Sequence, residues 1–147
     1  MGLINSLHIS SSALAAQRLR MDLIANNVTN MNTTNGPDVA PYRRQSVVFA
    51  EQGSTAPFGD FLGRARSNAP AGGVEVRAIH TDTTAPREVF DPSHPDANGD
   101  GYVLMPNIDV VTEMTDLAGA SRAYEAAVTV LNATKALAMN ALNIGRG

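Results

Sequence analysis

Two stretches, one at each end of the chain, carry apolar residues at helical spacing. In residues 1–35 apolar side chains recur every seven positions at Leu7, Leu14, Met21 and Val28. The adjacent line carries Leu3, Ile24 and Met31. Intervals of three and four place such residues on one stripe of a helix. The Asn, Thr and Gly residues at 30–36 favour turns and predict the end of this helix.

The pattern in residues 108–147 is longer. Its first apolar line steps by four and three through Val110, Met114, Leu117, Ser121, Tyr124, Val128, Leu131, Lys135, Ala138 and Leu142. A second line runs beside it through Ala123, Ala127, Val130, Leu137, Ala141 and Ile144. Asn107 is a plausible N-cap and Gly145 a stop signal. A helix over 108–144 would be about 55 Å long, against a radius of gyration of about 15 Å for a compact chain of this size. We therefore expect its apolar faces to need other helices or other subunits.

The middle segment, residues 36–107, contains all eight prolines and alternates apolar residues with turns. Runs rich in Val, Ile, Phe and Tyr predict strands at 42–51, 73–81, 87–90 and 101–105. Residues 52–72 are predicted to form a mobile loop. The expected fold class is α+β, with long N- and C-terminal helices that pair as a coiled-coil-like assembly domain and a small antiparallel β middle region.

Composition and charge exclude several classes of protein function. The chain of 147 residues has a net charge of −3, which argues against a general grip on nucleic acid. It has no cysteine, so disulfides and thiolate metal sites are excluded. No apolar run approaches the ~18 residues of a membrane span, and no signal-peptide pattern opens the sequence. Twenty-two alanines, nine of them in the last segment, suit close packing between helices.

Motifs that could support chemistry are few. His8, His80 and His94 do not pair at metal-ligand spacing. The run from Asp96 to Gly101 matches the start of a calcium loop, but Asn107 stands where that loop needs a glutamate, so a tight turn is favoured and a weak cation site stays open. Myristoylation and glycosylation patterns at the N-terminus and at three Asn residues are interpreted as incidental. An enzyme that uses His94, Asp96 and Asp100 would lack a positioned base, so we expect no catalytic residues, no metal and no cofactor.

Two pairs of arginines suggest ion pairs rather than anion binding. Arg43 and Arg44 would point to opposite faces of a strand. They could not bind one anion together, so we expect them to form salt bridges between subunits. Arg18 and Arg20 are candidates to meet acids such as Asp116 or Glu125 on neighbouring helices.

The end of the first helix resembles a known signature. The run from Ala25 to Thr33, followed by Pro41-Tyr42-Arg43-Arg44, is similar to the N-terminal motif of bacterial flagellar rod and hook proteins, the axial family. Residues 91–102 and 120–126 narrow the resemblance to proximal rod proteins. The motif residues are Ala25, Asn26, Asn27, Asn30, Asn32, Thr33, Pro41, Tyr42, Arg43, Arg44, Ser121, Arg122 and Tyr124.

The resemblance implies a structural subunit of the flagellar basal-body rod, the drive shaft that crosses the periplasm and transmits motor torque. Such proteins leave the cell through the flagellar type III system without a cleaved signal, and their terminal helices form an inner tube. The implied partners are copies of the chain, other rod proteins and proteins at the junction with the export gate; no nucleic acid, membrane insertion or small-molecule ligand is implied. The alternative is a secretion-system adaptor that binds partner helices without forming a rod. The expected assembly residues are Leu7, Leu14, Met21, Ile24, Val28, Met114, Leu117, Tyr124, Val128 and Leu131.

Overall fold

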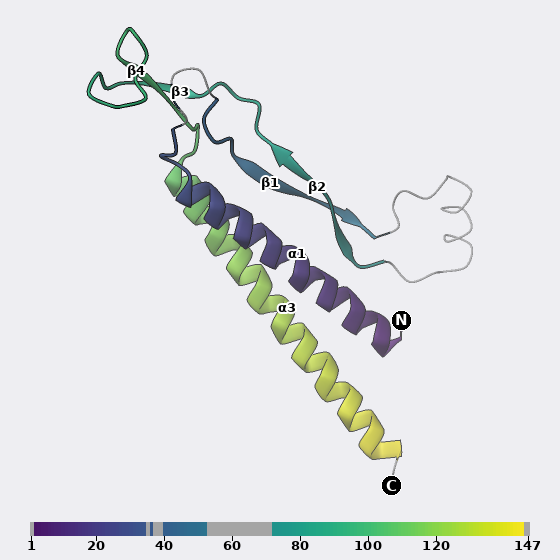
Figure 1. Cartoon of the computed structure of the whole chain (residues 1–147). Helices are drawn as coiled ribbons and strands as arrows, with labels where there is room; N and C mark the ends of the chain where they lie inside the picture. The colour runs from purple at the N-terminus through teal and green to yellow at the C-terminus, as the bar shows by residue number, and fades with distance from the viewer. Residues whose placement is uncertain (1, 35, 37–39, 53–71, 146–147) are drawn as a thin grey trace, which may run out of the picture. The chain divides into compact units, whose positions relative to one another are not determined.

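The computed structural model describes residues 2–34, 36, 40–52 and 72–145 of the chain. Two long helices stand at the ends of the sequence, with strands between them (Figure 1). The elements are α1 (Leu3–Thr29), β1 (Gln45–Glu51), β2 (Val74–Thr81), β3 (Arg87–Phe90), β4 (Tyr102–Met105) and α3 (Val110–Gly145). The predicted α+β class is confirmed.

The helix ends follow from local side-chain hydrogen bonds. α1 ends at Thr29, where Thr29 Oγ1 and Asn30 Nδ2 donate to main-chain carbonyls four residues earlier. The prediction of Asn107 as the N-cap of α3 is wrong. Asp109 caps this helix instead, because its carboxylate accepts the backbone N–H groups of Val111 and Thr112 at 3.3 and 3.2 Å.

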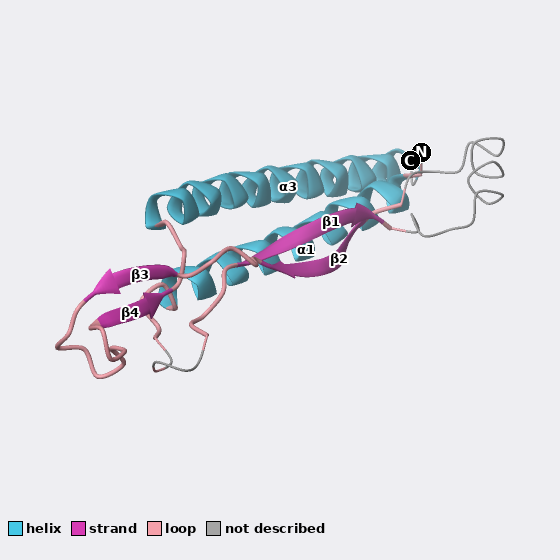
Figure 2. Cartoon of the chain, turned by 90° about the horizontal axis from the view of Figure 1, so that it is seen from above, coloured by secondary structure: helices cyan, strands magenta, loops and turns pink. Residues whose placement is uncertain are grey.

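The strands form two separate two-stranded sheets (Figure 2). β3 and β4 are antiparallel, with Arg87 opposite Met105 and Phe90 opposite Tyr102. β1 pairs with β2, and their arrows run in opposite directions (Figure 1). β3 has the predicted bounds, while β1 begins at Gln45 rather than at residue 42. Most of the loop predicted at 52–72, namely residues 53–71, lies outside the described residues.

The chain divides into two compact units, each drawn from several parts of the sequence. Unit 1 contains Met1–Arg18, Val48–Ala78 and Ser121–Gly147, and unit 2 contains Leu19–Val47 and Ile79–Ala120. The division into segments 1–35, 36–107 and 108–147 stays a prediction.

Few large apolar side chains are buried in the part of the chain that the structure describes. The buried apolar residues there are Ala16, Leu23, Ile24, Val103 and Ala120. Of the expected assembly residues Ile24 is buried, while Met114 and Leu117 are exposed. The fully buried positions of α3 are Glu113 and Ala120, which lie seven residues apart on a line that the sequence analysis did not select. The apolar pattern missed this line because one position is charged and the other small.

A close approach between backbone and helix occurs in unit 1 at Gly73. The Val74 N–H donates to Ser12 Oγ at 3.0 Å, and this hydroxyl donates in turn to the Ile9 carbonyl at 2.8 Å. A Cβ atom on Gly73 would lie 2.3 Å from Ser12 Oγ. Glycine is therefore required here by space, since real Cβ atoms do not approach so closely.

We expect Gly73→Ala to destabilise the chain by about 1–3 kcal/mol, because Ser12 would have to move and lose both hydrogen bonds. Gly119→Ala is the matched control. It adds a methyl group on α3 that meets nothing within 4 Å among the described residues beyond its sequence neighbours and the adjacent helical backbone, and it should stabilise the helix by up to about 1 kcal/mol. Urea unfolding of both variants measures the difference, and equal stabilities would contradict the close approach.

Candidate functional site

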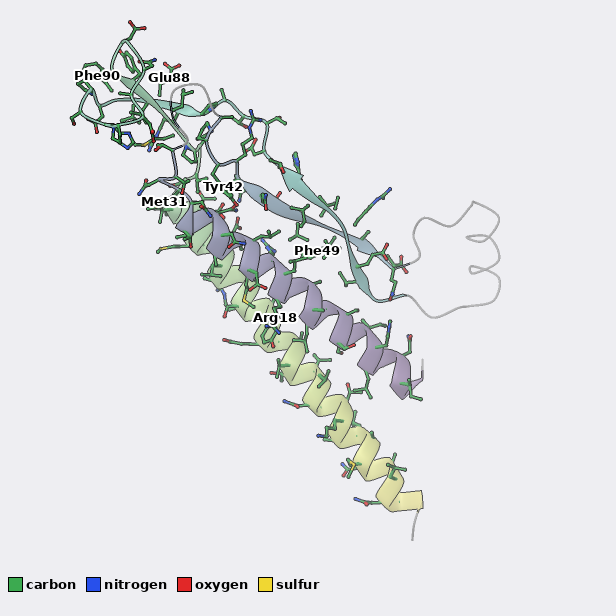
Figure 3. The ribbon with its side chains drawn as sticks, viewed as in Figure 1. Arg18, Met31, Tyr42, Phe49, Glu88 and Phe90 are labelled. Carbon is green, nitrogen blue, oxygen red and sulfur yellow. The ribbon has the colours of Figure 1, made fainter. Side chains whose placement is uncertain are left out.

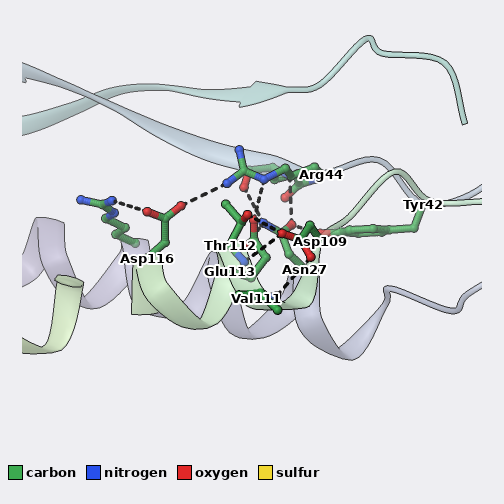
Figure 4. Close-up of polar contacts among 10 residues, drawn as sticks. Asn27, Tyr42, Arg44, Asp109, Val111, Thr112, Glu113 and Asp116 are labelled. Carbon is green, nitrogen blue, oxygen red and sulfur yellow. Dashed lines mark hydrogen bonds and ion pairs between the residues drawn. The ribbon is translucent and has the colours of Figure 1, made fainter. Parts of the chain in front are cut away.

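A polar cluster with a buried centre lies in unit 2 and joins α1, residues 42–45 at the start of β1, and the start of α3 (Figure 4). We call it the polar junction; it consists of Arg20, Asn27, Tyr42, Arg44, Gln45, Glu113 and Asp116. Asn27 is at its centre and is fully buried, with 0% of its surface exposed.

The carboxamide of Asn27 makes every hydrogen bond that it can make. Its Nδ2 donates to the Gln45 carbonyl at 2.8 Å and to Glu113 Oε2 at 3.0 Å. Its Oδ1 accepts from the Gln45 N–H at 2.9 Å and from the Tyr42 hydroxyl at 3.0 Å. The two bonds to Gln45 imitate the pairing of neighbouring strands, so a side chain of α1 sets where β1 begins. A buried amide satisfied in this way specifies one arrangement of the segments around it.

Glu113 brings a negative charge into the junction and is also fully buried. Its Oε1 accepts from Arg44 Nε at 2.5 Å, and Arg44 Nη2 reaches Asp116 Oδ2 at 3.3 Å. Arg20 Nη2 lies 3.5 Å from the other oxygen of Asp116. A buried carboxylate is costly unless it is paired and hydrogen-bonded, and Arg44 and Asn27 meet that requirement here.

Tyr42 is held as a donor by its surroundings. Burial raises the pKa of its hydroxyl, and the nearby Glu113 carboxylate raises that pKa further. The hydroxyl therefore stays protonated at neutral pH and donates to Asn27.

Two of the four arginines expected to form ion pairs do so within the chain. Arg44 makes its ion pairs within the chain, with Glu113 and Asp116. Arg20 meets Asp116, one of the predicted acids, also within the chain. Arg43 is exposed, whereas Arg44 is half-buried, in keeping with the predicted opposite faces. Glu113 was not predicted as a junction residue. The sequence feature that could have identified it is an acidic residue in the first turn of the helix, seven positions before the small residue Ala120.

The N-cap of α3 gives a pH dependence that can be measured. The pKa of Asp109 is lowered below its ordinary value of 3.8. The main cause is the hydrogen bond from the Thr112 hydroxyl, and hydrogen bonds from backbone N–H groups lower the pKa further. A carboxyl group whose pKa is lowered on folding stabilises the chain fully above its unfolded pKa, and that contribution is lost as the pH falls through the folded pKa.

We expect Asp109→Asn to keep the cap, since asparagine caps helices well, but to remove this acid sensitivity. Stability measured by urea unfolding should fall less steeply below a pH of about 4 in the variant than in the original chain. Identical pH profiles of the two proteins would contradict this role of Asp109.

The loop that resembles a calcium site is closed by its own hydrogen bonds. Asn98 Oδ1 accepts the N–H groups of Asp100 and Tyr102, and Asp96 Oδ2 accepts the Thr34 hydroxyl. Gly101 has the positive φ of a tight turn, +82°. Among the described residues no three His, Asp or Glu side chains are grouped closely enough to hold a metal ion.

Large apolar side chains are exposed along α3 and on the β3–β4 hairpin. Phe90, which is labelled in Figure 3, forms an edge-to-face pair with Tyr102, with the ring centroids 5.2 Å apart. None of the described helices is long and apolar enough to cross a bilayer. The exposed apolar residues of α3 are Val111, Met114, Leu117, Val130, Leu137, Met139, Leu142 and Ile144.

Comparison with known proteins gives a consistent result at both ends of the chain. Residues 7–37 match the family model of the flagella basal body rod protein, and residues 100–144 match that of the flagellar basal body rod FlgEFG protein C-terminal region. The flagellar basal-body rod protein FlgC of Borreliella burgdorferi is 43% identical over the whole of both chains. FlgC of Bacillus subtilis is 43% identical over 97% of each chain, and FlgC of Salmonella typhimurium is 40% identical over 99% of this chain and 100% of the relative.

Proposed function

The chain belongs to the FlgC family of flagellar basal-body rod proteins, and from that premise we propose that its two terminal helices polymerise it into the rod. It is a structural subunit of the flagellar basal body and acts with other rod components in motility. We propose that it acts by packing against neighbouring subunits and catalyses no reaction.

The length of the two helices and the apolar residues that α3 exposes support this assembly role. α3 has 36 residues and α1 has 27, which corresponds to lengths of about 54 and 40 Å. The last part of α3 exposes Val130, Leu137 and Ile144, with 55%, 63% and 82% of their surfaces accessible. Exposed apolar side chains repeated along a helix are typical of a face that another protein covers.

These three residues lie seven positions apart, the spacing of a coiled-coil seam. We therefore place the contacts between subunits on this line and on the exposed Met114 and Leu117. The part-buried Leu7, Leu14, Met21, Val28, Tyr124, Val128 and Leu131 complete the proposed assembly set. Contacts that join unlike surfaces of successive copies do not close into a ring, and they generate a filament such as a rod.

The proposed drive-shaft role follows from the same arrangement. Long helices packed side by side resist twisting and transmit torque, while the strands contact neighbouring rod proteins. The export route through the flagellar type III apparatus, the contacts with copies of the chain and the contact with proteins at the export-gate junction are part of this proposal.

Purified basal bodies test the proposal. Cells that carry an epitope-tagged copy in place of the original should yield basal bodies with the tag on the rod, seen by immunogold electron microscopy. A tag found with export components and absent from rods would favour the adaptor role instead.

A further inference from the structure

An Asn-Gly dipeptide, Asn98-Gly99, lies in the connection between β3 and β4. Both residues are exposed, and apart from Gly99 itself and its two neighbours in the sequence no described residue has an atom within 4 Å of the place where a Cβ on Gly99 would be. Within the described part of the chain the Gly99 N–H donates no hydrogen bond, and neither does Asn98 Nδ2. The backbone nitrogen after Asn98 and the side-chain amide group are therefore both unhindered.

The oxygen of the same carboxamide is held by two donors. Asn98 Oδ1 accepts the Asp100 N–H at 3.0 Å and the Tyr102 N–H at 2.9 Å. Two backbone N–H groups on one carbonyl oxygen are the arrangement that stabilises the negative charge which develops there when a nucleophile adds to the carbon. The loop thus presents an electrophile with its oxyanion donors already in place.

We propose that Asn98 is a site of spontaneous deamidation in the folded chain. The Gly99 nitrogen, which loses its proton to hydroxide from the solvent, attacks Asn98 Cγ and forms the new C–N bond. The bond from Cγ to Nδ2 breaks as this nitrogen takes up a proton from water, which regenerates hydroxide. Ammonia leaves, and a five-membered succinimide remains. One water molecule then opens the ring at either carbonyl and gives aspartate or isoaspartate at position 98.

The isoaspartate product would change the hairpin. It adds one methylene group to the main chain between Cα of residue 98 and the Gly99 nitrogen. Two main-chain hydrogen bonds close the loop across the link between residues 98 and 99. The Asn98 N–H donates to the Tyr102 carbonyl at 2.8 Å, and the Gly101 N–H donates to the Asn98 carbonyl at 3.0 Å. Both products also add a negative charge next to Asp100. The exposed pair of Phe90 and Tyr102 would be displaced as the subunit ages.

The test measures the rate of deamidation in the full chain by peptide mapping and mass spectrometry, with isoaspartate detected by its methyltransferase. Aliquots are kept in mildly alkaline buffer with and without urea. In urea the deamidation rate of the other Asn-Gly dipeptide of the sequence, Asn35-Gly36, serves as the reference for an unfolded chain. We expect the folded chain to react at Asn98 at least about as fast as the unfolded chain, because the donors offset the loss of flexibility. A folded rate more than about threefold below the unfolded rate overturns the proposal.

Gly99→Ala is the matched variant. The added methyl group meets no described residue other than its two neighbours in the sequence, so the loop should stay intact by circular dichroism and urea unfolding. The bulk of alanine beside the attacking nitrogen should lower the rate at position 98 at least about tenfold. An unchanged rate in this variant would mean that ammonia is lost by direct hydrolysis, which also overturns the proposed route.

Discussion

Replacement of Asn27 with leucine is expected to lower the free energy of unfolding by about 3–5 kcal/mol. Leucine is of similar size but would leave four polar groups without partners. They are the Gln45 N–H, the Gln45 carbonyl, the Tyr42 hydroxyl and one oxygen of Glu113. Each unsatisfied buried group costs about 1–3 kcal/mol, and part of that cost is recovered if water enters. Urea unfolding followed by circular dichroism gives the change directly.

Asn26→Leu is the control for this experiment, because Asn26 precedes Asn27 on α1 and its side chain is exposed. Its effect on stability should stay within about 0.5 kcal/mol. If the two substitutions destabilise the chain equally, the polar junction does not hold α1, β1 and α3 together in the way described.

Leu137→Glu is expected to abolish incorporation of the subunit into the rod while it leaves the isolated chain almost as stable as before. Leu137 is 63% exposed, so the charge meets water in the monomer and should change its stability by no more than about 0.5 kcal/mol. In the assembly the same charge would be buried without a partner, which costs several kcal/mol at every contact. Swimming in soft agar and electron microscopy of basal bodies measure the loss.

Leu137→Met is the matched control, since methionine keeps an apolar side chain of similar volume. Cells with this variant should swim and assemble rods normally. Normal rods in cells that carry Leu137→Glu would show that this face of α3 is not covered by a neighbouring subunit.

The sequence predicted the elements well because each has a strong local signal. The spacing of Leu7, Leu14 and Met21 marks α1, and the turn-forming residues after Thr29 end it. The bounds of β3 were predicted fully because the prolines and turn residues around it leave no alternative.

The polar junction could not be derived in the same way. The bonds that tie it to α3 include pairs of residues that are 69 to 86 positions apart, such as Arg44 and Glu113 or Asn27 and Glu113. Helical periodicity ranks positions by how apolar they are, so it passed over Glu113 and favoured the exposed Met114 beside it. The family motif contained Asn27, Tyr42 and Arg44, but only the three-dimensional arrangement gives each of them a partner.

The start of β1 illustrates the same limit. Residues 42–44 were predicted as the start of a strand because Tyr42 and the apolar residues that follow favour strands. The side chains of Tyr42 and Arg44 instead bind Asn27 and Glu113, and the ladder with β2 begins only at Gln45. Tertiary contacts of these side chains thus override the strand preference.

A cryo-electron microscopy map of intact basal bodies that contain this chain would show where its terminal helices lie. We expect α1 and α3 of every copy to lie in the inner wall of the rod. We also expect neighbouring subunits to cover Val130, Leu137 and Ile144. A map in which these three side chains face solvent, or in which the helices lie outside the rod wall, would contradict the proposed assembly.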